Sequence, residues 1–147
     1  MMNPGLLLLR LIVGGIFAVH GYTKLFGGPG KPVPPEAERY LGPGFVQFMQ
    51  VGPKGFAESL RAMGVPMPDI MAIVVGAVEF FGGLLLMVGC LVRPAALLLS
   101  ADMVVAIWKV HLPNGLVGPK GFEFPLSLLG GCLALLFANR GTRKVEA

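Results

Sequence analysis

The amino-acid sequence predicts an all-α membrane protein, an antiparallel bundle of four transmembrane helices that forms a single domain over residues 1–147. Hydrophobic residues make up 54% of the chain and charged residues only 14%, whereas about 25% of a typical soluble domain is charged. The mean hydropathy is +0.74. Because a small soluble domain is mostly surface, it would need more charged side chains than the 12 basic and 8 acidic residues present. This composition excludes a soluble domain and a disordered chain.

Four apolar segments approach the roughly 20 residues that a helix needs to cross a hydrocarbon core of about 30 Å. They cover residues 6–25, 69–91, 95–111 and 122–138. The first segment lacks a basic leader and a small-residue cleavage site, so we expect it to be retained. Pro94 suits the first turn of the third segment, and only a few residues separate it from the second. The second and third spans are therefore expected to form a tight antiparallel hairpin.

The connection over residues 26–68 is extramembrane in character, since it holds most of the Pro and Gly and several charged residues. Its segment 55–63 (GFAESLRAM) places Phe56, Leu60 and Met63 on one face, which predicts a short interfacial helix. Two interpretations remain open. The helix is a lid over a site, or it caps the bundle and pins the chain to the lipid headgroups.

Four spans put both termini on the same side of the membrane. Basic residues of the tail (Arg140, Arg143 and Lys144) and of the second loop (Arg93) favour cytoplasmic N- and C-termini in a bacterial cytoplasmic membrane. The net charge of +4 does not indicate nucleic-acid binding, because the basic residues are scattered singly. The expected partner is instead the lipid bilayer.

Small and ionisable residues follow one helical face of each span, which predicts that these faces meet in the bundle interior. The four faces are Arg10, Gly14, Phe17, Gly21 and Lys24; Gly76, Glu79, Gly83, Leu86, Cys90 and Arg93; Ala95, Leu98, Asp102, Val105 and Lys109; and Glu123, Ser127, Gly130, Ala134 and Phe137.

The proposed topology assigns a depth to each ionisable residue. Glu79 lies about 16 Å along its helix from Pro68, near the midplane, at about 1.5 Å per residue. Asp102 has a similar depth on the next helix. The residues of the outer third are His20, Lys24, Lys109, His111 and Glu123, and those near the inner boundary are Arg10 and Arg93. Most of the polarity therefore converges on the outer mouth of the bundle.

Each polar residue has a structural and a functional interpretation. Glu79 is either part of a functional site or a structural partner for Lys24 or His20. Asp102 either shares a proton with Glu79 or pairs with Lys109. His20 and His111 either make interhelical hydrogen bonds or transfer protons.

The sequence favours neither a metal nor a cofactor held by the chain itself. Two histidines and two carboxylates are a possible ligand set, but no Glu-x-x-His pair or HExxH motif is present. Haem ligation motifs, flavin fingerprints and cluster cysteines are also missing. Cys90 and Cys132 lie 42 positions apart (132 minus 90) in apolar segments, so we expect both to be buried apolar residues.

Four segments carry a resemblance to a known family. They are RLIVGGIFAVHGYTKLFG (10–27), GFAESLRAMGVPMP (55–68), EFFGGLLLMVGCLVRPAALLL (79–99) and HLPNGLVGPKGFEFPLSLL (111–129). With these segments the chain resembles the DoxX family of small four-helix bacterial membrane proteins over nearly its whole length. The resemblance implies a link to membrane oxidoreductase systems and to a quinone or quinol. The matched family-typical positions are Arg10, His20, Lys24, Glu79, Arg93, His111 and Glu123.

The leading hypothesis is a membrane subunit of a quinone-linked oxidoreductase system that binds a quinone or a similar small redox molecule in the outer half of the bundle. The expected catalytic residues are Glu79, His20 and His111, and the expected ligand-binding residues are Lys24, Arg10, Arg93, Glu123, Asp102 and Lys109. Electrons would come from a protein partner. The alternatives are a non-catalytic anchor or assembly subunit of a larger complex and, with weaker motivation, a permease for a small anion or sulfur species. A homo-oligomer is a further expectation.

Overall fold

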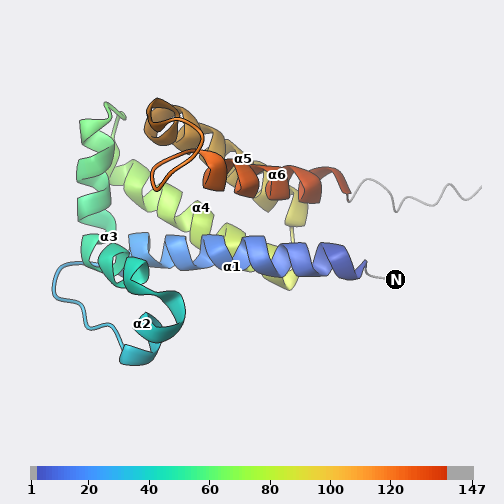
Figure 1. Cartoon of the computed structure of the whole chain (residues 1–147), viewed down its shortest axis with the longest axis horizontal. Coiled ribbons are helices and arrows are strands. Elements are labelled where there is room, and N and C mark those ends of the chain that lie inside the picture. Colours follow the sequence, from blue (N-terminus) through green and yellow to red (C-terminus); the bar gives the residue numbers. More distant parts are fainter. Residues whose placement is uncertain (1–2, 139–147) are drawn as a thin grey trace, which may run out of the picture. The chain divides into compact units, whose positions relative to one another are not determined.

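The computed structural model describes residues 3–138, and its secondary structure is entirely helical. The helices are α1 (Pro4–Phe26), α2 (Pro35–Leu41), α3 (Pro43–Ala62), α4 (Pro68–Val88), α5 (Val92–Ala106) and α6 (Glu123–Ala138) (Figure 1). A π-helical turn (Ile107–His111) and a short 3-10 turn (Leu112–Asn114) continue α5. Over residues 3–138 there is no strand, which confirms the all-α class. The basic tail residues Arg140, Arg143 and Lys144 lie outside the described residues.

Three of the described helices are long and apolar enough to cross a membrane. They cover Pro4–Phe26, Pro68–Val88 and Val92–Asn114, and they correspond to the first three predicted spans. α6 is also apolar but has 16 residues, or about 24 Å at 1.5 Å per residue. The protein is therefore a multi-pass membrane protein.

The long connection between the first two spans contains more helix than the sequence pattern indicated. The predicted short helix at 55–63 is the second half of α3, which begins at Pro43, and α2 precedes it. Both α2 and α3 start with a proline, whose fixed φ suits a first helical turn. Gly42 separates the two helices with a φ of 83°, a conformation that favours glycine.

α3 is kinked at Gly52, where φ is 59° and the backbone is not helical. A Cβ atom at this position would lie 2.5 Å from the carbonyl carbon and oxygen of Gly27. The backbone N–H of Gly28 donates to the carbonyl oxygen of Met49 at 2.6 Å, so the kink rests directly on the end of α1. Pro53, which follows, cannot donate a backbone hydrogen bond and sharpens the break.

The described residues group into two compact units, and the division falls within α1 and α4. The α2–α3 unit comprises residues 16–81. In it, Ala57 and Leu60 of α3 pack with Ala72 of α4. In the same unit α1 also packs on α4, where a Cβ on Gly21 would collide with the backbone nitrogen of Phe80. These two helices therefore touch backbone to backbone.

The α5–α6 unit comprises the residues up to Gly15 and those from Gly82 onward. α5 and α6 lie side by side in it and run in opposite directions (Figure 1). Their buried side chains include Ala96, Leu99 and Met103 of α5 and Leu128, Cys132 and Leu135 of α6. Only three residues, 89–91, connect α4 to α5, which confirms the short predicted connection. The expectation that both cysteines are buried holds for Cys132 and is wrong for Cys90, which is exposed near this turn.

The predicted interior faces are confirmed for most positions on α1 and α4, whereas Cys90 and Arg93, which follow the end of α4, are exposed. On α1 and α4 the buried residues include Gly14, Phe17, Gly21, Gly76, Glu79, Gly83 and Leu86. The corresponding predictions for α5 and α6 are wrong in most positions. The exposed members are Leu98, Val105, Lys109, Glu123, Ser127, Gly130, Ala134 and Phe137. On α5, Ala95 of the predicted face is buried, but the other buried residues, Val92, Ala96, Leu99, Ser100 and Met103, lie outside that face. On α6 the buried residues are Pro125, Leu128, Cys132 and Leu135, none of which belongs to the predicted face.

Candidate functional site

The candidate site lies in the α2–α3 unit, where α1 and α4 bring a lysine and a glutamate together. Lys24 Nζ lies 2.6 Å from both Oε1 and Oε2 of Glu79. The Glu79 side chain is 4% exposed and the Lys24 side chain 23%. Of the two structural partners predicted for Glu79, Lys24 is therefore the one that the geometry selects. The short distances and the deep burial make this a charge-assisted pair in a water-poor environment.

Glycine packing explains why the pair can form. Gly76 lies one turn before Glu79 on α4, and a Cβ there would lie 3.3 Å from Cβ of Lys24. Gly21 lies one turn before Lys24 on α1, against the backbone of Gly76 and Phe80. Because both helices lack side chains at this level, their axes approach closely enough for the long side chains of Lys24 and Glu79 to meet.

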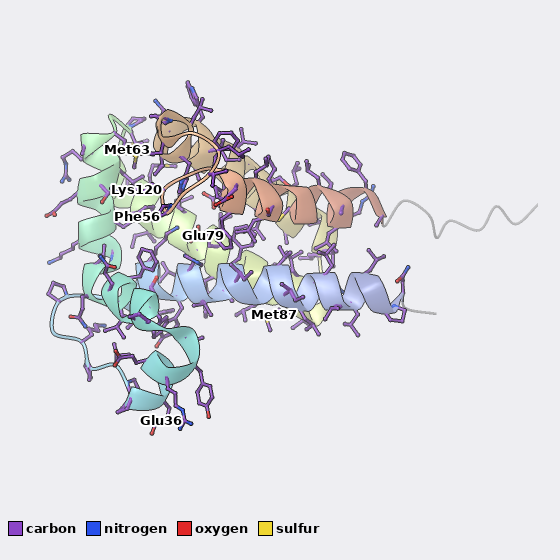
Figure 2. The ribbon with its side chains drawn as sticks, viewed as in Figure 1. Glu36, Phe56, Met63, Glu79, Met87 and Lys120 are labelled. Carbon is purple, nitrogen blue, oxygen red and sulfur yellow. The ribbon has the colours of Figure 1, made fainter. Side chains whose placement is uncertain are left out.

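An aromatic ring from α3 covers the lysine. The centroid of the Phe56 ring lies 4.7 Å from Lys24 Nζ, within the range of a cation–π contact. Phe56 and Glu79 are both labelled in Figure 2, on α3 and α4 respectively. The ammonium group therefore has a buried carboxylate as one neighbour and an apolar ring as another, and both limit its access to water.

His20 lies one helical turn before Lys24 on α1. Its ring contacts the ring of Phe48, with centroids 5.7 Å apart and an angle of 51° between the planes. His20 also lies within electrostatic range of Glu79 and Lys24. The buried hydroxyl of Thr23 donates to the backbone carbonyl of His20 at 2.8 Å, which fixes the local backbone. Three predicted site residues thus form one group, which we call the covered ion pair: His20, Lys24 and Glu79, with Phe48 and Phe56 over them.

Sequence reasoning missed the role of the two phenylalanines. Phe56 was assigned to the apolar face of an interfacial helix, and Phe48 was not singled out. No sequence signal identifies them, because residues 48 and 56 lie on different halves of α3 and their positions depend on its kink at Gly52. Neither pattern nor composition indicates that Phe48 contacts His20 or that Phe56 covers Lys24.

Three other predicted site residues belong to the α5–α6 unit and contact their own surroundings. Lys109 Nζ lies 4.6 Å from the Trp108 ring centroid. His111 Nδ1 lies 2.8 Å from the backbone oxygen of Lys120. Because a carbonyl oxygen can only accept, Nδ1 carries the proton in this contact, and Nε2 of a neutral His111 is left as an acceptor. Glu123 begins α6, and its Oε1 accepts from the backbone N–H of Gly118 at 3.4 Å.

The remaining predicted residues of this unit are Arg10, Arg93 and Asp102, and each lies in a different place. The guanidinium of Arg10 lies beside Gly89, since a Cβ there would be 2.8 Å from Nη1. Arg93 is exposed in the first turn of α5. Asp102 is half-buried on α5, within electrostatic range of Cys132 on α6.

The described residues also bear on whether the chain holds a metal site. Within residues 3–138, no group of three or more His, Cys, Asp and Glu side chains is placed to hold a metal ion. An open depression of about 340 Å³ lies in the loop before α6, lined by residues 114 and 117–121, mostly glycine, proline and aliphatic groups. Its lining offers little chemistry beyond Lys120 and Asn114.

Comparison with known proteins identifies related sequences. The family model of DoxX matches residues 5–112. The chain is 30% identical to "Putative oxidoreductase CatD" of Bacillus subtilis (strain 168) over 131 residues, which are 89% of this chain and 78% of the relative. It is also 30% identical over 149 residues to "Uncharacterized membrane protein Rv3486" of Mycobacterium tuberculosis, covering 94% and 77% of the two chains.

A third relative is an "Uncharacterized protein" of Haemophilus influenzae, 29% identical over 130 residues, with 88% and 72% of the two chains covered. No solved structure matches this chain. The matches thus extend over most of the chain and of each relative.

Proposed function

Since the chain belongs to the DoxX family, we propose that it is a membrane subunit of a quinone-linked oxidoreductase system and that the covered ion pair binds a quinone or quinol headgroup. The observation that carries the proposal is the Lys24–Glu79 contact at 2.6 Å, buried and covered by Phe56. An ionisable pair inside membrane helices is costly to maintain and is commonly functional. The name of the Bacillus subtilis relative, "Putative oxidoreductase CatD", supports the same class of reaction.

The lysine suits a quinone carbonyl. An ammonium group has three N–H donors, and the two Glu79 oxygens take two of them. The third is then available to the carbonyl oxygen of a quinone. In this water-poor setting such a hydrogen bond is electrostatically stronger than the same contact in water.

The Glu79 carboxylate and the His20 imidazole can take part in the proton transfers that quinone reduction requires. Reduction of a quinone to a quinol takes up two electrons and two protons. Glu79 can accept a hydrogen bond from a quinol hydroxyl, and His20, one turn away on α1, can hold or release a proton. The sequence carries no motif for a flavin, haem or iron–sulfur cluster, so the electrons are assigned to a partner protein.

The proposal includes the orientation of the helices in the membrane. We assign α6 as a fourth span, with both termini on the cytoplasmic side of a bacterial inner membrane. In this arrangement the isoprenoid tail of a quinone leaves between apolar helices. Further ligand contacts from His111, Arg10, Arg93, Glu123, Asp102 and Lys109 stay a prediction, which the same assay on their variants tests.

The test is the quinone content of the purified protein. We would purify wild-type protein and the Glu79→Gln variant gently from native membranes, extract both with organic solvent, and quantify quinone per chain. We expect quinone close to one per chain in the wild type and at least a tenfold lower content in Glu79→Gln. The amide keeps the size of the carboxylate but removes the charge that holds Lys24 in place.

The matched control is Glu58→Gln, since Glu58 is an exposed glutamate on α3. It should retain the wild-type quinone content. If Glu79→Gln retains its quinone while both variants stay monodisperse and fold normally, the covered ion pair is not the binding site. If well-folded wild-type protein carries no quinone, the quinone assignment fails as a whole.

A second function, a non-catalytic anchor or assembly subunit, has one specific observation in its favour. The Lys24–Glu79 pair joins α1 to α4, which is what a purely structural contact would do. In that case Glu79→Gln lowers the melting temperature and the yield of a partner complex together, and no quinone copurifies. The permease alternative has no comparable geometric support.

A further inference from the structure

The two halves of α3 are held in different ways. The second half, after Gly52, packs into an apolar core through Ala57 and Leu60, which are 2% and 8% exposed and lie against Ala72. This half carries Phe56, the ring over Lys24. Because its contacts are buried and apolar, moving it would open a core.

The first half of α3 buries one side chain, that of Met49, and is otherwise held by exposed polar contacts near its end. The side chain of Gln50 accepts from the backbone N–H of Gly30 at 2.9 Å and donates to the backbone oxygen of Lys31 at 3.0 Å, both at exposed positions. Water competes well for exposed hydrogen bonds, so this contact opens more readily than a packed core. This half carries Phe48, the ring against His20.

The backbone between the two halves of α3 can bend, because its helical geometry is already interrupted there. Gly52 has a φ of 59° and no intact helical geometry, and Gly42, with a φ of 83°, separates the first half from α2. Residues 43–51, the first half of α3, therefore form a segment with a glycine of positive φ at each end, which we call the α3 cover. One further backbone contact, from Gly28 to Met49, lies close to this kink and holds the pivot in place.

We propose that Phe48 is a ligand-contacting residue that selects flat rings, and that the α3 cover carries it away from His20 and back by bending at Gly52. The choice of a quinone or quinol as the ligand rests on the proposed function. An aromatic ring prefers to stack on another flat ring, whereas a puckered ring cannot match its face. Phe48 is 49% exposed while it contacts His20, so the same side chain can reach a ligand as well.

Movement of the cover is tested without any ligand. Diethyl pyrocarbonate modifies accessible histidines, and the chain has only His20 and His111, which peptide mass spectrometry resolves. In purified full-length protein we expect Gln50→Ala to raise the modification rate of His20 at least threefold and to leave that of His111 unchanged. Gln47→Ala, an exposed glutamine on the same half of α3, is the control and should match the wild type. Equal rates of His20 modification in the wild type, Gln50→Ala and Gln47→Ala would overturn the proposed movement of the α3 cover.

Selection of flat rings is tested by protection of His20 in the same assay. The probes are duroquinone, which is flat, and 1,4-cyclohexanedione, which has the same pair of carbonyl groups on a puckered ring. We expect duroquinone to slow modification of His20 at least threefold in the wild type and in Phe48→Tyr. Protection should be lost in Phe48→Leu, and 1,4-cyclohexanedione should not protect.

The outcomes separate this inference from the proposed function. Equal protection by duroquinone in Phe48→Leu and wild type would overturn the role of Phe48 and would leave the quinone site standing. Protection by 1,4-cyclohexanedione at the level of duroquinone would overturn the selection of flat rings. If Gln50→Ala exposes His20 but neither probe protects it in any variant, the cover stands, and both the role of Phe48 and the quinone assignment fail.

Discussion

α1 and α4 meet through glycines, whereas α5 and α6 meet through larger apolar side chains. At two levels a Cβ added on α1 would collide with α4: at Gly21, 2.2 Å from the backbone of Phe80, and at Gly14, 2.6 Å from the oxygen of Gly83. The residues that α5 and α6 bury include Leu99, Leu128 and Leu135. The first contact brings backbones together and leaves room for an ion pair, and the second fills space with side chains.

This difference teaches when small residues mark a packed face. On α1 and α4 the small residues are buried because glycines on both helices stand at matching levels. On α6 a similar series of small residues is exposed, and a Cβ added to Gly130 would have no neighbour within 4 Å. A stripe of small residues on one helix thus predicts close packing only when its neighbour provides the complementary surface.

The largest expected difference in stability comes from adding one methyl group at a buried glycine of α1 and at an exposed glycine of α6. Gly21→Ala is expected to destabilise the protein by at least about 3 kcal/mol, the upper end for overpacking, because the clash is with backbone that cannot rotate away. Gly130→Ala should leave the melting temperature unchanged or slightly raised, since alanine favours the helix. Thermal unfolding of both variants in the same detergent measures the difference. Equal melting temperatures would remove the distinction between the two contacts.

The ion pair offers the next largest effect. Lys24→Met leaves Glu79 buried without its cation, and breaking a buried pair in this way costs about 3 kcal/mol or somewhat more. Combining Lys24→Met with Glu79→Gln removes the charge and should recover most of that loss. Thermal unfolding of the two single variants and the double variant gives the coupling between the residues. Additive effects would mean that the pair does not act as a unit.

The α5–α6 contact should respond more moderately. Leu135→Ala removes a side chain that is 2% exposed, and we expect a cost of about 2 kcal/mol, the low end for core deletions, because lipid is itself apolar. Ala134→Leu, on the exposed face of α6, should change the melting temperature little. A larger effect at residue 134 than at residue 135 would show that the other face of α6 is the packed one.

Much of the fold follows from the sequence because hydrocarbon thickness sets helix length. The first three predicted spans agree with helices of the structure to within a few residues. The helices of the long connection were largely missed, since α2 is short and charged and the first half of α3 begins with a Pro-Gly pair and is also short. Their structure depends on Pro35 and Pro43 starting a helix rather than ending one.

The site was partly predictable for a similar reason. Lys24 and Glu79 stand out because charged residues within apolar spans need partners, and one of the two predicted partners of Glu79 is confirmed. The covering residues Phe48 and Phe56 could not be predicted, because phenylalanine is common in such chains and its contacts depend on the kink at Gly52. The local contacts of His111 with Lys120 and of Lys109 with Trp108 likewise depend on turn geometry that no periodic pattern encodes.

The sequence separation of Lys24 and Glu79 has a consequence for biosynthesis. The two residues lie 55 positions apart, and a ribosome adds about 5–20 residues per second, so α1 waits roughly 3–11 s before its partner glutamate has been made. During that interval the lysine must extend its stem toward the membrane surface, as long basic side chains do. A nascent chain that stalls before residue 79 therefore keeps Lys24 at the membrane surface, and the lysine moves into its buried contact only after Glu79 has been made.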